Sequence, residues 1–282
     1  MAAGAGTRLH PASIPISKIL LPVYDKPMIY YPLSTLIMGG IRDILVITNK
    51  EDDFKFRKLL GDGSQFGLKI DYLIQHVQRG ISDAFLIAED WIDGEDVVLI
   101  LGDNIFYGQG LEETILSAMK NNEGATMFGY YVKDPERFGV VEFDENMNVL
   151  SLEEKPKNPK SNYAVVGLYF YNGDVCEYAK RLKPSDRGEL EITDLNKIYM
   201  EEGKLRVKLF DESIEWKDAG TFDSLLDTGI LIRDAKKNSG INVGCPEKIA
   251  LEKGFVSKED ILKRIVKFKD NDYREYVEKL CN

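Results

Sequence analysis

The sequence is poor in the residues that build many active sites. It has two histidines, His10 and His76, and three cysteines, Cys176, Cys245 and Cys281. So few histidines argue against a histidine-based triad or a histidine-rich metal centre. An odd number of widely spaced cysteines argues against a disulfide framework or a zinc site and favours bland thiols in a reducing compartment. We therefore expect a cytoplasmic protein.

Long apolar runs and excess positive charge are also missing. No apolar run approaches the roughly 18 residues that a membrane-spanning helix requires, so we expect no membrane partner. The net charge of −10 argues against a general nucleic-acid-binding surface. A local group of basic side chains can still bind a small phosphorylated molecule.

Apolar runs rich in β-branched residues alternate with helical stretches. Residues 43–48 (DILVIT) and 96–101 (DVVLIL) are apolar enough to predict buried parallel strands. Further strands are expected at 124–132, 139–143, 149–154 and 164–171. The pattern predicts an α/β fold, a Rossmann-like three-layer α/β/α sandwich with a mostly parallel central sheet. Closely spaced strands between 139 and 171 predict a small antiparallel excursion.

Helical spacing marks four other stretches. Residues 27–40 predict a helix begun by Pro27 and ended by two glycines, and residues 82–92 predict another with Ser82 as its N-cap. Charged amphipathic patterns predict C-terminal helices at 257–268 and 272–281. We expect an α/β core at 1–235 and a C-terminal helical segment at 236–282.

The stretch GAGTRLHPASIPISK, residues 4–18, combines glycines with basic side chains. Gly4 and Gly6 let backbone N–H groups approach an anion, and Arg8 and Lys18 add positive charge, as a polyphosphate requires. The Gly-Lys-Ser/Thr of a P-loop is missing, and Leu9 stands where a dinucleotide fingerprint needs its third glycine. An ordinary glycine-rich surface turn is the alternative.

The position of this loop in the chain raises a second expectation. Such a loop normally follows a buried strand, but Met1 already stands at its edge. Burying each large apolar side chain of a strand contributes roughly 1.5–3 kcal/mol. We therefore expect the native protein to begin earlier, with a first strand before residue 1.

Two carboxylates and one amide follow strand-like stretches. Asp103 and Asp218 could each supply a hard oxygen ligand to Mg²⁺. The alternatives are a turn-forming Asp-Asn pair at 103 and a helix N-cap at 218. Gln75 and Gly80 could read the edge of a base, although this signal is weak by itself.

A third group could bind a phosphorylated sugar. Glu154 could accept hydrogen bonds from sugar hydroxyls, while Lys155 and Arg187 could neutralise a phosphate. Glu154 and Lys155 could instead belong to a solvated cluster of charges in a hairpin. Arg187 could instead lie in a region that caps a helix.

Taken together, these blocks resemble a known family. GAGTRLHP, LLGDGSQFG, LGDNIFYG, DPERFGVVEF, LEEKPKNPKSNYAVVGLYFY and RGELEITD are similar to the sequences of glucose-1-phosphate thymidylyltransferases, which are sugar nucleotidyltransferases. The resemblance covers the whole chain. It implies that dTTP and α-D-glucose 1-phosphate give dTDP-glucose and pyrophosphate by Mg²⁺-assisted in-line attack, the first step towards dTDP-rhamnose. It also implies a homotetramer.

The resemblance assigns roles by motif. Arg8 and Lys18 would be catalytic, and Asp103 and Asp218 would hold Mg²⁺. The nucleotide would be bound by Gly4, Gly6, Thr7, Arg8, Gln75, Gly80 and Asp103. The sugar phosphate would be bound by Asn104, Gly139, Glu154, Lys155, Val165, Tyr169 and Arg187.

Two other functions stay open. A uridylyltransferase using UTP is one, because thymine and uracil differ by a single methyl, which is worth only about 1–3 kcal/mol of discrimination. A non-catalytic regulatory protein that binds sugar nucleotides is the other. Intact Arg8, Lys18, Asp103 and Asp218 argue against the second.

Overall fold

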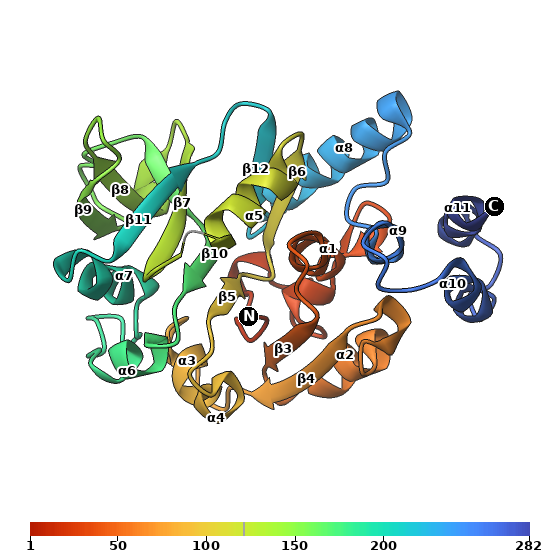
Figure 1. Ribbon diagram of the computed structural model, residues 1–282, viewed down its shortest axis with the longest axis horizontal. Helices are drawn as coiled ribbons and strands as arrows, with labels where there is room; N and C mark the ends of the chain where they lie inside the picture. The colour runs from red at the N-terminus through yellow and green to blue at the C-terminus, as the bar shows by residue number, and fades with distance from the viewer. Residues whose placement is uncertain (121) are drawn as a thin grey trace. The chain divides into compact units, whose positions relative to one another are not determined.

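The computed structural model describes residues 1–120 and 122–282. These residues pack as two units (Figure 1). Unit 1 consists of Met1 and residues 75–216, and unit 2 consists of residues 2–74 and 217–282.

Unit 1 is built on a sheet of six described strands centred on β10 (Tyr163–Tyr171). The order is β11-β7-β10-β8-β9, and β5 pairs with β10 outside this path. The other strands of the sheet are β5 (Val97–Ile100), β7 (Ala125–Tyr131), β8 (Gly139–Phe143), β9 (Val149–Glu154) and β11 (Leu205–Leu209). A separate pair is formed by β6 (Asn104–Gly108) and β12 (Ile214–Asp218).

This sheet is mixed, which corrects the prediction of a mostly parallel sheet. Strand β10 runs antiparallel to β5, β7 and β8, whereas β11 runs parallel to β7. The run at 96–101 does form a strand, but its pairing with β10 is antiparallel. Continuous hydrophobicity reports that both faces of a strand are buried and carries no information on direction. The expected antiparallel excursion is confirmed by β8, β9 and β10.

Helices of unit 1 pack against this sheet or against one another. Helix α7 packs against β9 and β11, and α6 packs against both α3 and α7. The region 82–92 forms two short helices that meet at Ala88 instead of one, and Ser82 Oγ donates to the carbonyl of Glu191 rather than capping α3. The helices are α3 (Asp83–Ile87), α4 (Glu89–Ile92), α5 (Leu111–Lys120), α6 (Val175–Lys180), α7 (Ile192–Glu201) and a 3-10 turn at Pro135–Arg137.

Unit 2 contains the parallel pair β3 (Asp43–Thr48) and β4 (Lys69–Ile74), so the prediction at 43–48 is confirmed. A short antiparallel pair joins β1 (Pro22–Val23) and β2 (Lys26–Pro27). The predicted helix at 27–40 is present but begins later, because Pro27 belongs to β2. The remaining elements before residue 240 are α1 (Tyr30–Met38), α2 (Asp53–Leu60), α8 (Phe222–Ser239) and 3-10 turns at Thr7–Leu9, Lys18–Leu20 and Ser64–Phe66.

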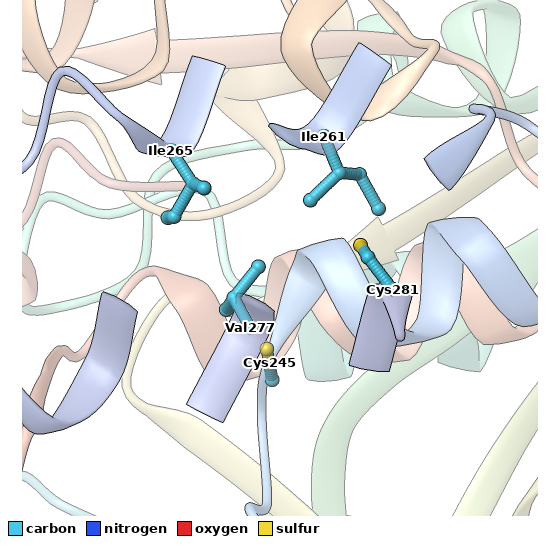
Figure 2. Close-up of a cluster of buried hydrophobic side chains, with 5 residues drawn as sticks. All are labelled: Cys245, Ile261, Ile265, Val277 and Cys281. Atoms are coloured by element: carbon cyan, nitrogen blue, oxygen red, sulfur yellow. The ribbon is translucent and has the colours of Figure 1, made fainter. Parts of the chain in front are cut away.

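Three helices end unit 2: α9 (Pro246–Glu252), α10 (Lys258–Ile265) and α11 (Asp272–Cys281). The helices predicted at 257–268 and 272–281 are therefore confirmed. In Figure 2, Ile261 and Ile265 of α10 face Val277 and Cys281 of α11, with the Cys245 sulfur beside them. Helix α9 packs against α1, so this apolar cluster adjoins the rest of the unit. Of the helices in the described ranges, none is both long and apolar enough to cross a bilayer.

Candidate active site

The glycine-rich loop of unit 2 is held in a tight turn. Gly6 adopts φ +63°, and a Cβ there would lie 3.2 Å from Lys18 Cβ and 3.3 Å from Ser13 Cβ. Ser13 Oγ donates to the Gly6 carbonyl at 2.7 Å, and buried Leu9 anchors the following turn. Positive φ and close packing together require glycine at this position.

The exposed face of the same loop carries the predicted phosphate-binding groups. Gly4, Thr7 and Arg8 are exposed, and Lys18 is half-buried with its Cε 3.9 Å from where a Gly4 Cβ would lie. Ser17 Oγ accepts from the Ile19 amide at 3.4 Å, which orders the turn that contains Lys18. The structure thus brings two cationic side chains to one glycine-rich loop, where backbone N–H groups can also meet an anion.

Arg8 also meets one of the predicted metal ligands. Its Nη2 lies 4.0 Å from Asp218 Oδ2, and the two side chains are 57% and 18% exposed. A Cβ at Gly220 would lie 2.4 Å from Arg8 Nη2 and 2.7 Å from Asp218 Oδ1. The absence of a side chain at Gly220 therefore makes room for both groups.

The Asp103–Asn104 pair lies in unit 1, at the start of β6. Asn104 is buried, and its Oδ1 accepts from the Gly167 amide at 2.9 Å and from Trp216 Nε1 at 2.7 Å. Its Nδ2 donates to Asp103 Oδ1 at 3.2 Å. Asn104 is thus tied to β10 and β12 and orients the Asp103 carboxylate.

The predicted sugar-binding residues gather on β8, β9 and β10 in unit 1. Gly139 lies opposite both Glu154 and Val165 in the strand register, and a Cβ on Gly139 would lie 3.4 Å from Glu154 Oε2. Lys155 Nζ lies 3.2 Å from Glu154 Oε1. Burial, reinforced by the charge of Glu154, raises the pKa of Tyr169, so this hydroxyl stays protonated and Glu154 supplies the negative charge there.

Arg187 adds a second cation to this group. Its Nη2 lies 2.8 Å from Glu191 Oε2, 3.5 Å from Glu154 Oε1 and 3.6 Å from Glu189 Oε2. Burial opposes its charge, but the hydrogen bond to Glu191 and the neighbouring carboxylates hold the pKa of the guanidinium above its ordinary value. The guanidinium is therefore a fixed positive charge beside the predicted sugar-binding residues.

Gln75 and Gly80 meet in unit 1, directly after β4. Gln75 Nε2 donates to the Gly80 carbonyl at 3.1 Å, and Gly80 adopts φ +99°. A Cβ on Gly80 would lie 2.6 Å from the Leu190 carbonyl oxygen, so only glycine fits there.

Sequence reasoning missed three residues that touch the predicted ones. Thr193 Oγ1 donates to Glu154 Oε2 at 2.7 Å, Glu191 holds Arg187, and Asp83 accepts from Gln75 at 2.9 Å. The spacing of four between Arg187 and Glu191 was not a usable signal, because residues 187–191 are not helical and the helical pairing rule does not apply to them. Nothing local in the sequence links Thr193 to Glu154.

Each of the two predicted metal ligands carries a suitable kind of donor atom. Asp103 and Asp218 each offer carboxylate oxygens, which are the ligands that Mg²⁺ prefers. In the described part of the chain, no three His, Cys, Asp or Glu side chains gather as a ready-made metal cage.

The chain is similar to known proteins over nearly its whole length. Residues 1–234 match the family model described as nucleotidyl transferase. The glucose-1-phosphate thymidylyltransferase of Neisseria gonorrhoeae is 51% identical over 98% of this chain and 96% of its own. That of Mycolicibacterium smegmatis is 50% identical over 100% of this chain and 98% of its own.

Solved structures agree with this fold. A Bacillus anthracis chain, provisionally described as a glucose-1-phosphate thymidylyltransferase and crystallised with sucrose, superposes with a TM-score of 0.76 at 42% identity. The match covers 83% of this chain and 93% of that chain. A UDP-glucose pyrophosphorylase complexed with UDP-glucose superposes at 0.72 with 24% identity, over 83% and 96% of the two chains, which is a likeness of fold alone.

Proposed function

Because the chain belongs to the nucleotidyl transferase family, we propose that it converts dTTP and α-D-glucose 1-phosphate to dTDP-glucose and pyrophosphate. The observation that carries this proposal is the glycine-rich loop with Arg8 exposed beside Asp218. Relatives at about half identity over the full chain carry the name of this activity.

The reaction is an electrostatic problem more than a covalent one. Two like unit charges about 4 Å apart repel by roughly 4 kcal/mol at an effective dielectric of ~20, and both substrates carry several charges. Arg8 and Lys18 contact the triphosphate, together with the backbone of Gly4, Gly6 and Thr7. Their role is to neutralise charge that develops on the α-phosphate and on the departing pyrophosphate.

The sugar phosphate is held by the cluster in unit 1. Lys155 and Arg187 bind its phosphate, and Glu154 accepts hydrogen bonds from hexose hydroxyls. Gly139 and Val165 line the hexose pocket, with Asn104 and Tyr169 nearby. A phosphate monoester is already ionised near neutral pH, so the attack needs orientation and no general base.

Asp103 and Asp218 are the residues that would hold Mg²⁺, whose charge would neutralise phosphate oxygens. Gln75 and Gly80 contact the base. Of these two carboxylates, Asp218 lies beside Arg8.

The proposal extends to fold and assembly. We propose a Rossmann-like three-layer α/β/α arrangement for the core at 1–235, with a C-terminal helical segment at 236–282. The enzyme would work in the cytoplasm as a homotetramer in the route to dTDP-rhamnose.

A pyrophosphate-release assay tests the function. The full chain is mixed with Mg²⁺, glucose 1-phosphate and either dTTP or UTP. Release with dTTP and glucose 1-phosphate together, and with neither alone, supports the proposal. Faster turnover of UTP would make the chain a uridylyltransferase, and binding without release would make it a regulatory protein.

A further inference from the structure

The orientation of the Gln75 amide is fixed by a buried carboxylate that the proposed reaction does not use. Gln75 is 4% exposed, and its Nε2 donates to Asp83 Oδ2 at 2.9 Å and to the Gly80 carbonyl at 3.1 Å. Asp83 itself is 1% exposed and also accepts from Arg79 Nη2 at 2.8 Å. Four groups thus form one small network at the end of β4.

The chemistry of this network permits only one amide orientation. An ionised carboxylate and a backbone carbonyl can only accept hydrogen bonds, whereas a glutamine amide has two N–H donors and one carbonyl acceptor. Both donors of Gln75 are therefore consumed by Asp83 and Gly80. Rotating the amide by half a turn would set its Oε1 against two acceptors and break both hydrogen bonds.

The carbonyl Oε1 of Gln75 is consequently the atom left for a ligand. Among the described residues, no side chain or backbone N–H donates to it, while both Nε2 hydrogens are engaged. A ligand group that faces Oε1 must be a donor. Thymine and uracil present such a donor at N3–H, whereas cytosine presents a lone pair at N3.

We infer that Asp83 is a positioning residue that sets the base specificity of the site. By fixing the Gln75 amide so that Oε1 is the acceptor left for a ligand, it admits a pyrimidine with N3–H and rejects cytosine. This inference rests on the proposed function, in which Gln75 meets the base, and it does not separate thymine from uracil. The Arg79 guanidinium compensates the buried charge of Asp83 but does not determine the orientation of the Gln75 amide.

Wild-type protein gives the first test. The full chain is assayed for pyrophosphate release with glucose 1-phosphate, Mg²⁺ and dTTP, dCTP or 3-methyl-dTTP, whose N3 carries no hydrogen. We expect kcat/KM for dTTP to exceed both others by at least about 100-fold, because a site built around a hydrogen bond strongly rejects a substrate that cannot form it. Comparable turnover of dTTP and dCTP would overturn the inference and leave the proposed function intact. No release with any nucleotide would instead overturn the proposed function.

Asp83→Asn gives the second test. The Oδ1 of the new asparagine accepts from Arg79, so its Nδ2 faces Gln75. Because Nδ2 is a donor, it favours the opposite orientation of the Gln75 amide, with Oε1 towards residue 83. We expect the dTTP/dCTP ratio of kcat/KM to fall at least about tenfold, a change typical of leaving a polar group mispaired. Arg79→Lys is the matched control, because it keeps a cation beside the Asp83 carboxylate, and the ratio should stay within about twofold.

Two readouts separate positioning from a general loss of structure. Circular dichroism and the melting temperature identify a variant that does not fold. If Asp83→Asn does not fold, the inference is judged by the wild-type comparison of dTTP with dCTP and 3-methyl-dTTP. In a Gln75→Ala background, Asp83→Asn should leave the ratio unchanged, because Asp83 acts through Gln75. If Asp83→Asn slows dTTP and dCTP equally, Asp83 has a structural role and the inference is wrong.

Discussion

Arg8 and Asp218 lie side by side without forming a close ion pair: Nη2 and Oδ2 are 4.0 Å apart. The carboxylate is largely covered, while the guanidinium is 57% exposed. At this separation, in partial solvent, the attraction orients Arg8 without neutralising it. The guanidinium therefore keeps its five donors available for phosphate oxygens.

Arg8→Ala should lower kcat for pyrophosphate release by about 10²–10³-fold, the usual cost of removing one preorganised donor from a developing charge. Arg8→Lys should recover only part of this loss, because an ammonium cannot present two parallel N–H groups. Arg57→Ala is the control, since Arg57 is an exposed arginine of unit 2 that pairs with Asp53 on α2. A kcat for Arg8→Ala above one tenth of wild type would contradict the assigned role.

Glu191→Gln should weaken the binding of glucose 1-phosphate. The Glu191 carboxylate is 10% exposed and holds Arg187 at 2.8 Å. A hydrogen bond between charged groups is worth about 1.5–3 kcal/mol, and part of this keeps Arg187 in place. We expect KM for glucose 1-phosphate to rise about tenfold, with KM for dTTP unchanged within about twofold.

Glu189→Gln is the matched control for this prediction. Glu189 reaches the same guanidinium at 3.6 Å and is 43% exposed, so its loss should change neither KM by more than about twofold. Equal effects of the two variants would mean that Arg187 responds to total charge and not to the Glu191 contact.

Local patterns predicted the elements of the fold better than their connections. The strand at 43–48 follows from its continuous apolar run, and the two C-terminal helices follow from their amphipathic periodicity. The direction of β5 does not, because it is decided by β10, far away in the sequence. Likewise, Pro27 is compatible with both the first turn of a helix and the short strand that it occupies.

The candidate site likewise has one part that the sequence predicts and another that it does not. The loop around Arg8 could be predicted because glycines and cations stand close together in the sequence. The hydrogen bond from Gln75 to Asp83 could not, since an aspartate at the start of a helical pattern is equally consistent with a helix-terminus role. Thr193 and Glu154 are brought together only by the packing of α7 on β9.

Unit 2 also contains a buried ammonium that no sequence pattern marked. Lys26 is 2% exposed and donates to Asn242 Oδ1 at 2.6 Å and to Asp25 Oδ1. Asp25 in turn accepts from Lys236 at 2.9 Å. These bonds tie β2 to the end of α8 and to the segment before α9.

Lys26→Met should therefore destabilise the protein. Removing one partner of a buried pair costs about 3–5 kcal/mol, here towards the lower end because Asp25 retains Lys236. The melting temperature should fall by roughly 6–12 °C, given about 2–4 °C per kcal/mol for chains approaching this size. Lys263→Met, at a side chain 75% exposed, should change it by less than about 1 °C. Similar melting temperatures for both variants would show that the buried network adds no net stability.

Glu247 gives the same region a pH dependence. Burial raises the pKa of this carboxyl above its ordinary 4.5, although the hydroxyl of Tyr273 and the charge of Lys26 act in the other direction. The folded state therefore holds this proton more tightly than the unfolded state, and this contribution to stability is lost as pH rises from about 4.5 through the folded pKa.

Glu247→Gln removes the titration but keeps an acceptor for Tyr273. The melting temperature of the variant, relative to wild type, should therefore increase as pH rises from about 4.5 through the folded pKa and then level off. Thermal melts of the variant and the wild type in matched buffers measure this, and a difference that stays constant with pH would mean that burial does not raise the pKa of Glu247.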